Sequence, residues 1–155
     1  MMPRLYSRAY LLSLVLAASL CACSMFGPSK YTALRQIQVI APGDANQNTA
    51  TAIDLVFVYD QPAMAVLPLS GPQWFANKAP LSTTLLNRID VVSIQLQPSS
   101  LVDPVALPAH YKKALAVYSF VNFIAPAGQG RAYLTLFKQA VITLGPDTVT
   151  YSGTR

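Results

Sequence analysis

The sequence predicts a mostly-β domain, a β-sandwich with few helices, and three observations favour that fold class. Several short runs alternate apolar and polar residues, as strands do when they bury one face. The 12 prolines and 7 glycines of the 155-residue chain separate those runs with turn signals. No long window repeats apolar residues at the 3.6-residue period of an amphipathic helix. Roughly six or seven short strands joined in this way are typical of two packed sheets.

The first two predicted strands flank the most polar loop of the chain. The first strand lies within residues 34–40 and ends before Pro42, because proline cannot donate a backbone hydrogen bond. Residues 42–52, PGDANQNTATA, lack large apolar side chains and form the predicted loop. Residues 53–60, IDLVFVYD, carry apolar side chains at every second position and predict a strand. Its inner face would hold Ile53, Leu55, Phe57 and Tyr59, and its outer face Asp54, Val56, Val58 and Asp60.

The segment after the second strand is interrupted by prolines and predicts two short helices rather than a strand. Residues 71–79 would form one helix, with a proline in its first turn, where proline is well tolerated. Residues 81–87 would form another, with Ser82 as its N-cap. We expect Trp74 and Phe75 to close the edge of the core. The alternative is an aromatic pair that is exposed for docking.

The second half of the chain supplies the remaining predicted strands. Residues 90–97, DVVSIQLQ, alternate and predict a strand, and the adjacent Val91 and Val92 leave room for a bulge. After a proline-rich connection, residues 113–123, KALAVYSFVNF, are apolar on both faces and predict a central strand. Residues 132–138 and 140–144 are expected to form two strands or one bent strand, and residues 148–152 close a hairpin.

The first 22 residues predict a secretory signal peptide rather than part of the fold. Arg4 and Arg8 form a basic head, and residues 9–20, AYLLSLVLAASL, are uncharged and largely apolar. That run is shorter than the roughly 20 residues that a membrane-spanning helix needs. The alternative, a buried N-terminal helix, would alternate polar and apolar faces, and this run does not.

Both cysteines of the chain stand at the end of this leader, at Cys21 and Cys23. Leu20-Cys21-Ala22-Cys23 resembles the bacterial lipobox, in which a leucine and then a small residue precede the lipidated cysteine. The resemblance implies three acyl chains at Cys23, enough for permanent membrane anchoring. Ser24, in place of aspartate, implies export to the outer membrane. The competing interpretation, a disulfide or a metal pair, would need both cysteines retained and further metal ligands.

The predicted organisation is therefore a signal peptide over residues 1–22, a lipidated tether over 23–32 and one sandwich domain over 33–155. The formal net charge of +5 comes from scattered residues, and glutamate is absent from the sequence. Neither a basic stripe nor the interleaved aromatic residues of a nucleic-acid platform are present. Nucleic acid is therefore not an expected partner.

We find no catalytic, cofactor-binding or metal-binding pattern in the sequence, and we do not expect an enzyme. The lone His110 lies in a proline-flanked loop, where a solvated side chain is its ordinary role. Asp54 and Asp60 share one predicted strand face, but they stand about 20 Å apart along it, too far for acid–base work on one bond. Gly128-Gln129-Gly130 lacks the third glycine and the strand-to-helix context of a phosphate loop.

The layout of the chain after the leader resembles the outer-membrane lipoprotein family of the type VI secretion system, TssJ, also called VasD. That family combines a lipobox, a first strand that ends in a small-residue and proline segment, a loop rich in Asn, Asp and Gly, and an aromatic helical stretch. Four segments carry the resemblance: IQVIAPGDANQNTATAIDLVFVYDQ (37–61), QWFANKAPLSTTLL (73–86), VSIQLQPSS (92–100) and KALAVYSFVNF (113–123).

The resemblance implies a transthyretin-like β-sandwich with a short helical insertion. It also implies a role in assembly, in which the lipoprotein anchors the secretion membrane complex to the periplasmic face of the outer membrane. In that family the loop between the first two strands contacts the periplasmic C-terminal domain of TssM, the inner-membrane component. Mapped onto this chain, the implied contact residues are Pro42, Gly43, Asp44, Ala45, Asn46, Gln47, Asn48 and Thr49.

Two alternatives stay open at this point. Residues 42–52 could be an inert surface loop, because polar loops on a rigid scaffold are common without a binding role. The chain could also be a pilotin-like or carrier lipoprotein that serves another envelope assembly. A carrier would need an apolar ligand groove, which the sequence would place near Trp74 and Phe75.

Overall fold

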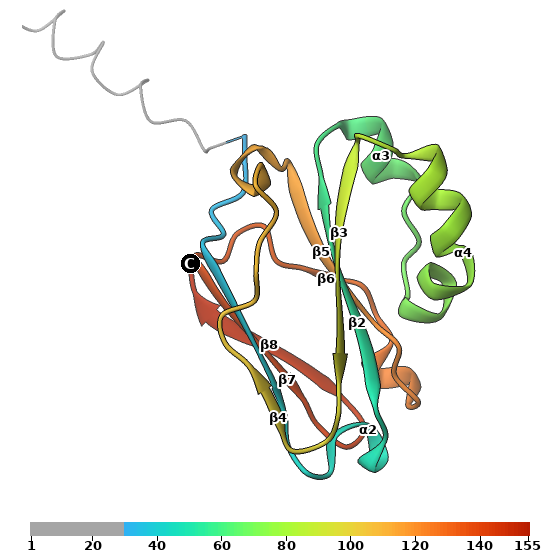
Figure 1. The fold of residues 1–155 in the computed structure, drawn as a ribbon, viewed down its shortest axis with the longest axis vertical. Coiled ribbons are helices and arrows are strands. Elements are labelled where there is room, and N and C mark those ends of the chain that lie inside the picture. The colour runs from blue at the N-terminus through green and yellow to red at the C-terminus, as the bar shows by residue number, and fades with distance from the viewer. Residues whose placement is uncertain (1–29) are drawn as a thin grey trace, which may run out of the picture.

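The structure, a computed structural model, describes residues 30–155, which form two four-stranded sheets packed face to face (Figure 1). The predicted β-sandwich is therefore confirmed, and the helical insertion with it. The predicted signal peptide, the lipobox and most of the tether lie outside the described residues. One sheet has the order β4-β1-β7-β8, with β1 (Gln36–Ala41), β4 (Ser100–Val102), β7 (Gln139–Leu144) and β8 (Val149–Thr154). The other has the order β3-β2-β5-β6, with β2 (Thr51–Val58), β3 (Ile89–Leu96), β5 (Ala116–Val121) and β6 (Ala132–Tyr133).

Strand β1 runs from one end of the sandwich to the other, and its direction defines two ends that matter below (Figure 1). It follows Lys30, the first described residue, and stops just before α2 (Ala45–Asn48). Strand β2 returns antiparallel to β3 and β5, so β2 ends where those two strands begin. The Thr32 N–H donates to the Ala114 carbonyl at 2.8 Å, which places the start of β5 beside the start of the described chain. We name these ends the Lys30 end and the α2 end.

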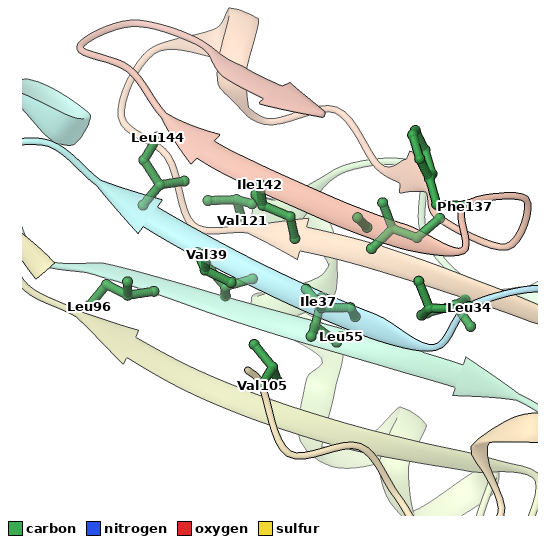
Figure 2. Packing of buried hydrophobic residues seen from close by; sticks show 14 of the residues in the cluster. Leu34, Ile37, Val39, Leu55, Leu96, Val105, Val121, Phe137, Ile142 and Leu144 are labelled. Carbon is green, nitrogen blue, oxygen red and sulfur yellow. The ribbon is translucent and has the colours of Figure 1, made fainter. Parts of the chain in front are cut away.

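The main core lies between the two sheets, and Figure 2 shows its side chains meeting there. In β1 and β7 alternate residues are buried, so each strand gives one face to the core and one to solvent. Parallel pairing of β1 with β7 brings Ile37 and Val39 beside Ala140 and Ile142. The opposing sheet contributes Leu55, Leu96 and Val121 to the same cluster.

The sheet that contains β2 and β5 is covered on its second face by two helices, α3 (Gln61–Val66) and α4 (Gly71–Thr84) (Figure 1). All six residues of β5 are buried, which confirms the predicted central strand. The outward side chains of both strands join a second apolar cluster with residues of the helices. Its buried members are Val56, Val58, Ala63, Leu67, Trp74, Leu85, Ile89, Ala116, Tyr118 and Phe120.

Helix α4 is one continuous helix of 14 residues, so the prediction of two helices broken near Pro80 is wrong. Trp74, Lys78, Leu81 and Leu85 recur at intervals of three and four residues and share the face toward the sheet. Pro80 lies on the exposed face, where it removes one backbone hydrogen bond without disturbing that contact. Packing on the sheet therefore outweighs the local tendency of proline to end a helix.

A buried carboxylate fixes α4 to the sheet. Asp54, predicted on the outer face of its strand, is only 1 % exposed because α4 covers it. The Trp74 indole N–H donates to Asp54 Oδ2 at 2.7 Å, and Lys78 Nζ lies 2.8 Å from the same oxygen. The Trp74 ring stacks on Phe120 with 4.9 Å between ring centroids. Trp74 is thus a core residue, as expected, and is not available as an exposed docking aromatic, while Phe75 is half-buried.

Three strand predictions need correction. Strands β2 and β3 pair in continuous register from Thr51–Leu96 to Val58–Ile89, so the suggested bulge at Val91 and Val92 is absent from this pair. The side chains of Val91 and Val92 instead point to opposite faces of the sheet, and each face packs against an apolar cluster. Residues 100–102, placed in a connection by their neighbouring prolines, form β4 at the sheet edge. The strand expected over residues 132–138 is reduced to the two residues of β6.

We predict that Trp74→Phe lowers the free energy of unfolding by about 2 kcal/mol, because it removes indole packing and leaves the buried Asp54 without one of its two partners. Urea denaturation followed by circular dichroism would measure this loss. Phe75→Leu, at the half-buried neighbour, serves as the control and should cost less. Equal losses for the two variants would show that the Asp54 contact contributes nothing to stability.

Candidate partner-binding end of the sandwich

The α2 turn has an unusual backbone that its sequence permits. Asn46, Gln47 and Asn48 have φ angles of 49°, 56° and 60°, so the turn has the left-handed conformation rather than that of an α-helix. Asparagine tolerates this region better than most residues, but each non-glycine residue there costs roughly 1–2 kcal/mol. The rest of the structure must therefore hold this turn in place.

Asn46 holds the α2 turn in place through three hydrogen bonds to three different segments of the chain. Its backbone N–H donates to the Gly145 carbonyl at 2.8 Å, and its side-chain Nδ2 donates to Thr51 Oγ1 at 2.9 Å. Its Oδ1 accepts the Ile124 N–H at 2.8 Å. The residue is only 1 % exposed, so its side chain is shielded from water. Asn46 thus ties the turn to β2, to the segment after β5 and to the β7–β8 turn.

Two further contacts join the neighbouring loops into one surface. The Gln47 side-chain amide donates to Asp147 Oδ1 in the β7–β8 turn at 3.0 Å. The Ser99 N–H, in the turn between β3 and β4, donates to the Pro42 carbonyl at 3.2 Å. Three connections that are far apart in the sequence therefore meet at the α2 end, which Figure 1 shows opposite the start of the described chain.

The structure divides the eight residues of the predicted contact loop into two groups. The loop itself is shorter than predicted, because β2 begins at Thr51. Ala45 and Asn46 are each only 1 % exposed, so these two of the eight implied contact residues do not face solvent. They position the turn and are not surface residues. The exposed members are Pro42, Gly43, Asp44, Gln47, Asn48 and Thr49.

The α2 end is acidic and polar, with an apolar side chain beside it. Asp44 and Asp147 are exposed there, and the segments that form this end, residues 41–52, 95–100, 121–125 and 144–149, contain no lysine or arginine. Ile124, half exposed, lies just after β5 and donates its N–H to Asn46. Sequence reasoning missed Ile124 and Asp147 as parts of this surface. Ile124 did carry a signal, since it is an apolar residue between a central strand and a proline turn.

The Lys30 end contains two hollows, of about 450 and 600 Å³, and neither is lined by Trp74 or Phe75. The first is lined by Tyr59, His110 and Lys113, among others, and the Tyr59 hydroxyl donates to Asp90 Oδ2 at 2.6 Å. Burial, this hydrogen bond and the charge of Asp90 raise the pKa of Tyr59 well above its usual range. The phenol thus stays neutral and acts as a donor rather than as a base. His110 is exposed, as expected.

Two other tyrosines have raised pKa values, for reasons that are structural. Burial raises the pKa of Tyr118, and the guanidinium of Arg131, 4.4 Å from the ring centroid, opposes that rise. Burial also raises the pKa of Tyr151.

Within residues 30–155, no cluster of three or more His, Cys, Asp or Glu side chains is arranged to hold a metal ion. The helices of this same part of the chain are all too short or too polar to cross a membrane.

Comparisons of the fold with solved structures give consistent matches. The type VI secretion lipoprotein TssJ1 from Pseudomonas aeruginosa matches with a TM-score of 0.57 at 14% identity, over 76% of this chain and 92% of that one. The chain has a TssJ-like fold. Lip from Serratia marcescens, a membrane-bound component of the type VI secretion system, matches with a TM-score of 0.54 at 13% identity, over 77% and 96% of the two chains.

A third match comes from a structure described as the C-terminal domain of the type VI secretion protein TssM from EAEC. Its TM-score is 0.53 at 15% identity, over 76% of this chain and 98% of that one. At these identities the matches establish the TssJ-like fold, and TssJ1 and Lip are described as a lipoprotein and a membrane-bound component of the type VI secretion system. No protein-family model and no curated protein sequence matches the chain.

We predict that Asn46→Ala lowers the free energy of unfolding by about 1–3 kcal/mol more than Asn48→Ala. Both substitutions put alanine at a left-handed position, so the backbone strain they add is matched. Only Asn46→Ala leaves the part-buried Ile124 N–H without its acceptor. Thermal or urea unfolding of the two variants measures the difference, and equal destabilisation would contradict the role given to the Asn46 side chain.

Proposed function

We propose that this protein is an outer-membrane-anchored periplasmic lipoprotein of a type VI secretion system, and that it anchors the membrane complex by binding the periplasmic C-terminal domain of TssM. The observation that carries the proposal is the TssJ-like fold, shared with type VI secretion lipoproteins over three quarters of the chain. The sequence resemblance to the same family, found independently of the fold, supports it.

The arrangement of the two ends supports a bridging role. The chain leading to the lipobox joins the sandwich at the Lys30 end, whereas the predicted contact loop lies at the α2 end (Figure 1). A protein held to the membrane at the first end would present the second toward the periplasm. Its α2 loop would then face a partner that approaches from the inner membrane.

The contact surface that we propose consists of the exposed α2 residues together with two neighbours that the sequence did not suggest, Ile124 and Asp147. Because hydrogen bonds already fix the backbone of the turn, little conformational entropy would be lost when a partner binds. Asp44 and Asp147 favour a partner surface that is positively charged at this point. The half-exposed Ile124 would supply the apolar centre that such interfaces commonly contain.

Membrane attachment is proposed to depend on Cys23. In this account residues 1–22 are removed, Cys23 carries the acyl chains, and Ser24 directs the protein to the outer membrane. Three chains exceed the two that stable anchoring needs.

The triple variant Asp44→Ala, Gln47→Ala, Thr49→Ala should weaken binding to the TssM periplasmic domain by tenfold or more, because it removes three of the exposed polar side chains of the turn and keeps Asn46. Surface plasmon resonance with the purified TssM domain measures the affinity. Lys112→Ala with Lys113→Ala, at the Lys30 end, is the control and should bind normally. Unchanged affinity of the triple variant, with unchanged thermal unfolding, would refute the α2 end as the contact surface.

Cys23→Ser should release the protein from membranes into the soluble periplasmic fraction, because the acceptor of the acyl chains is lost. Cys21→Ser should leave the protein in the outer-membrane fraction, since that cysteine would be removed with the signal peptide. Fractionation and metabolic labelling with palmitate distinguish the two. If Cys23→Ser stays membrane-bound and labelled while Cys21→Ser does not, the lipidated residue has been misassigned.

A further inference from the structure

The exposed positive charge of the described chain is concentrated at the Lys30 end. Residues 30–155 contain nine lysine and arginine residues. The two that lie away from this end, Lys78 and Arg131, are partly buried and are engaged by Asp54 and by Tyr118. The other seven are all exposed, and the strand directions place them at the Lys30 end: Lys30, Arg35, Arg88, Lys112, Lys113, Lys138 and Arg155.

Hydrogen bonds confirm that segments far apart in the sequence meet at this end. The Arg35 N–H donates to the Lys138 carbonyl at 2.8 Å, and the Lys138 N–H donates to the Thr154 carbonyl at 2.8 Å. The chain at Thr32 is bonded to Ala114, next to the 3-10 turn that carries Lys112 and Lys113. The Tyr59 N–H donates to the Arg88 carbonyl at 2.9 Å.

The acidic residues on the same half of the molecule do not cancel this charge. Asp60 accepts the Ala63 N–H and lies 3.6 Å from Arg88, and Asp90 accepts the Tyr59 hydroxyl. Asp103 is held by the side-chain amides of Gln36 and Gln38 on the β1 face. Three carboxylates thus stand against seven exposed cations, whereas the α2 end has two carboxylates and no cation.

Apolar side chains stand among the cations at the Lys30 end. Leu86, which follows α4, is 70 % exposed, and Leu136, between β6 and β7, is 59 % exposed. Tyr31 is 46 % exposed, and Lys30 Nζ lies 5.9 Å from the centroid of its ring. Exposed leucine and tyrosine next to lysine and arginine are typical of surfaces that rest on the interfacial region of a bilayer.

We propose that the Lys30 end is a membrane-docking face, whose lysines and arginines bind the phosphate groups of anionic phospholipids. The proposal rests on the proposed anchoring at Cys23 and goes beyond it, because it fixes the orientation of the domain and not only its attachment. Lys30 lies seven positions after Cys23, so the chain between them spans about 25 Å at most. The domain is thus always within reach of the lipid surface.

Charge and covalent attachment together select the membrane over a soluble acidic partner. Attraction to anionic headgroups fades over a Debye length of about 8 Å at physiological ionic strength, so it acts only on the end that the tether keeps close. The acidic α2 end would be repelled by the same surface. Both effects turn the α2 loop away from the membrane, toward the periplasm.

The test uses the full lipidated protein, reconstituted into vesicles of phosphatidylcholine alone or of phosphatidylcholine mixed with phosphatidylglycerol. An amine-reactive reagent followed by mass spectrometry gives the acylation rate of each lysine. We expect Lys112, Lys113 and Lys138 to react several-fold more slowly on the anionic vesicles, with the protection lost at high salt. Lys78, bound to Asp54, should react equally on both and is the internal control. Equal rates at all lysines on the two vesicles would overturn the proposal.

A matched pair of variants separates local charge from net charge. Lys112→Gln with Lys113→Gln removes two positive charges at the Lys30 end. Gln95→Glu with Gln97→Glu adds two negative charges near the α2 end, at one exposed position in β3 and one just after it, so the net charge changes equally. Only the first pair should lose the protection of Lys138. Loss in both pairs, or in neither, contradicts a docking face.

Two further outcomes are distinguishable from these. A protein that floats with neither vesicle refutes the anchoring at Cys23, and the docking proposal with it. A protein that floats normally but whose lysines become protected only when the TssM periplasmic domain is added shows that the Lys30 end is a protein interface. That result overturns the docking proposal while leaving the anchor intact.

Discussion

The burial of strand β2 on both faces is the constraint on which the rest of the structure depends. One face of β2 belongs to the core between the sheets, and the other is covered by α3 and α4. Covering that second face also buries Asp54, a charged group that would be costly to bury without partners. Trp74 and Lys78 supply them, so the same two residues fix α4 to the sheet. The helical insertion therefore covers one face of the sheet. The ends of the sandwich remain for the partner binding that we propose.

The two ends of the sandwich differ in charge and in backbone conformation, as the proposed role of a tethered adaptor would need. At the α2 end, Asn46 holds three left-handed residues in one conformation and thereby presents a preformed polar surface. At the Lys30 end, exposed cations are gathered from segments that are distant in the sequence. Strand β1 connects the two, so a chain tethered before Lys30 carries its first interstrand loop to the far side of the domain. The fold in which the two ends are arranged is shared with the secretion lipoproteins TssJ1 and Lip.

Much of the fold could be predicted, because the alternation of apolar and polar residues and the fully apolar runs indicate which strand faces are buried. The strand over residues 53–60 and the central strand over 113–123 follow from that signal alone. The single helix across Pro80 could not be predicted, because it is held by packing on the sheet, which lies outside any local window. Strand β4 could not be predicted either, because the prolines on both sides of it indicate a loop. At the candidate site the loop was found from its composition, but the inward position of Asn46 depends on Gly145 and Ile124, about 100 and 80 residues away in the chain.

The most direct test of the whole account is site-specific photo-crosslinking of the lipidated protein in cells that assemble a type VI secretion membrane complex. A photoreactive residue at position 49, at the α2 end, should crosslink to the periplasmic domain of TssM. The same residue at position 112, at the Lys30 end, should crosslink to lipid and leave TssM unmodified. The reverse pattern, with TssM captured from position 112 and not from position 49, would contradict the assignment of the two ends.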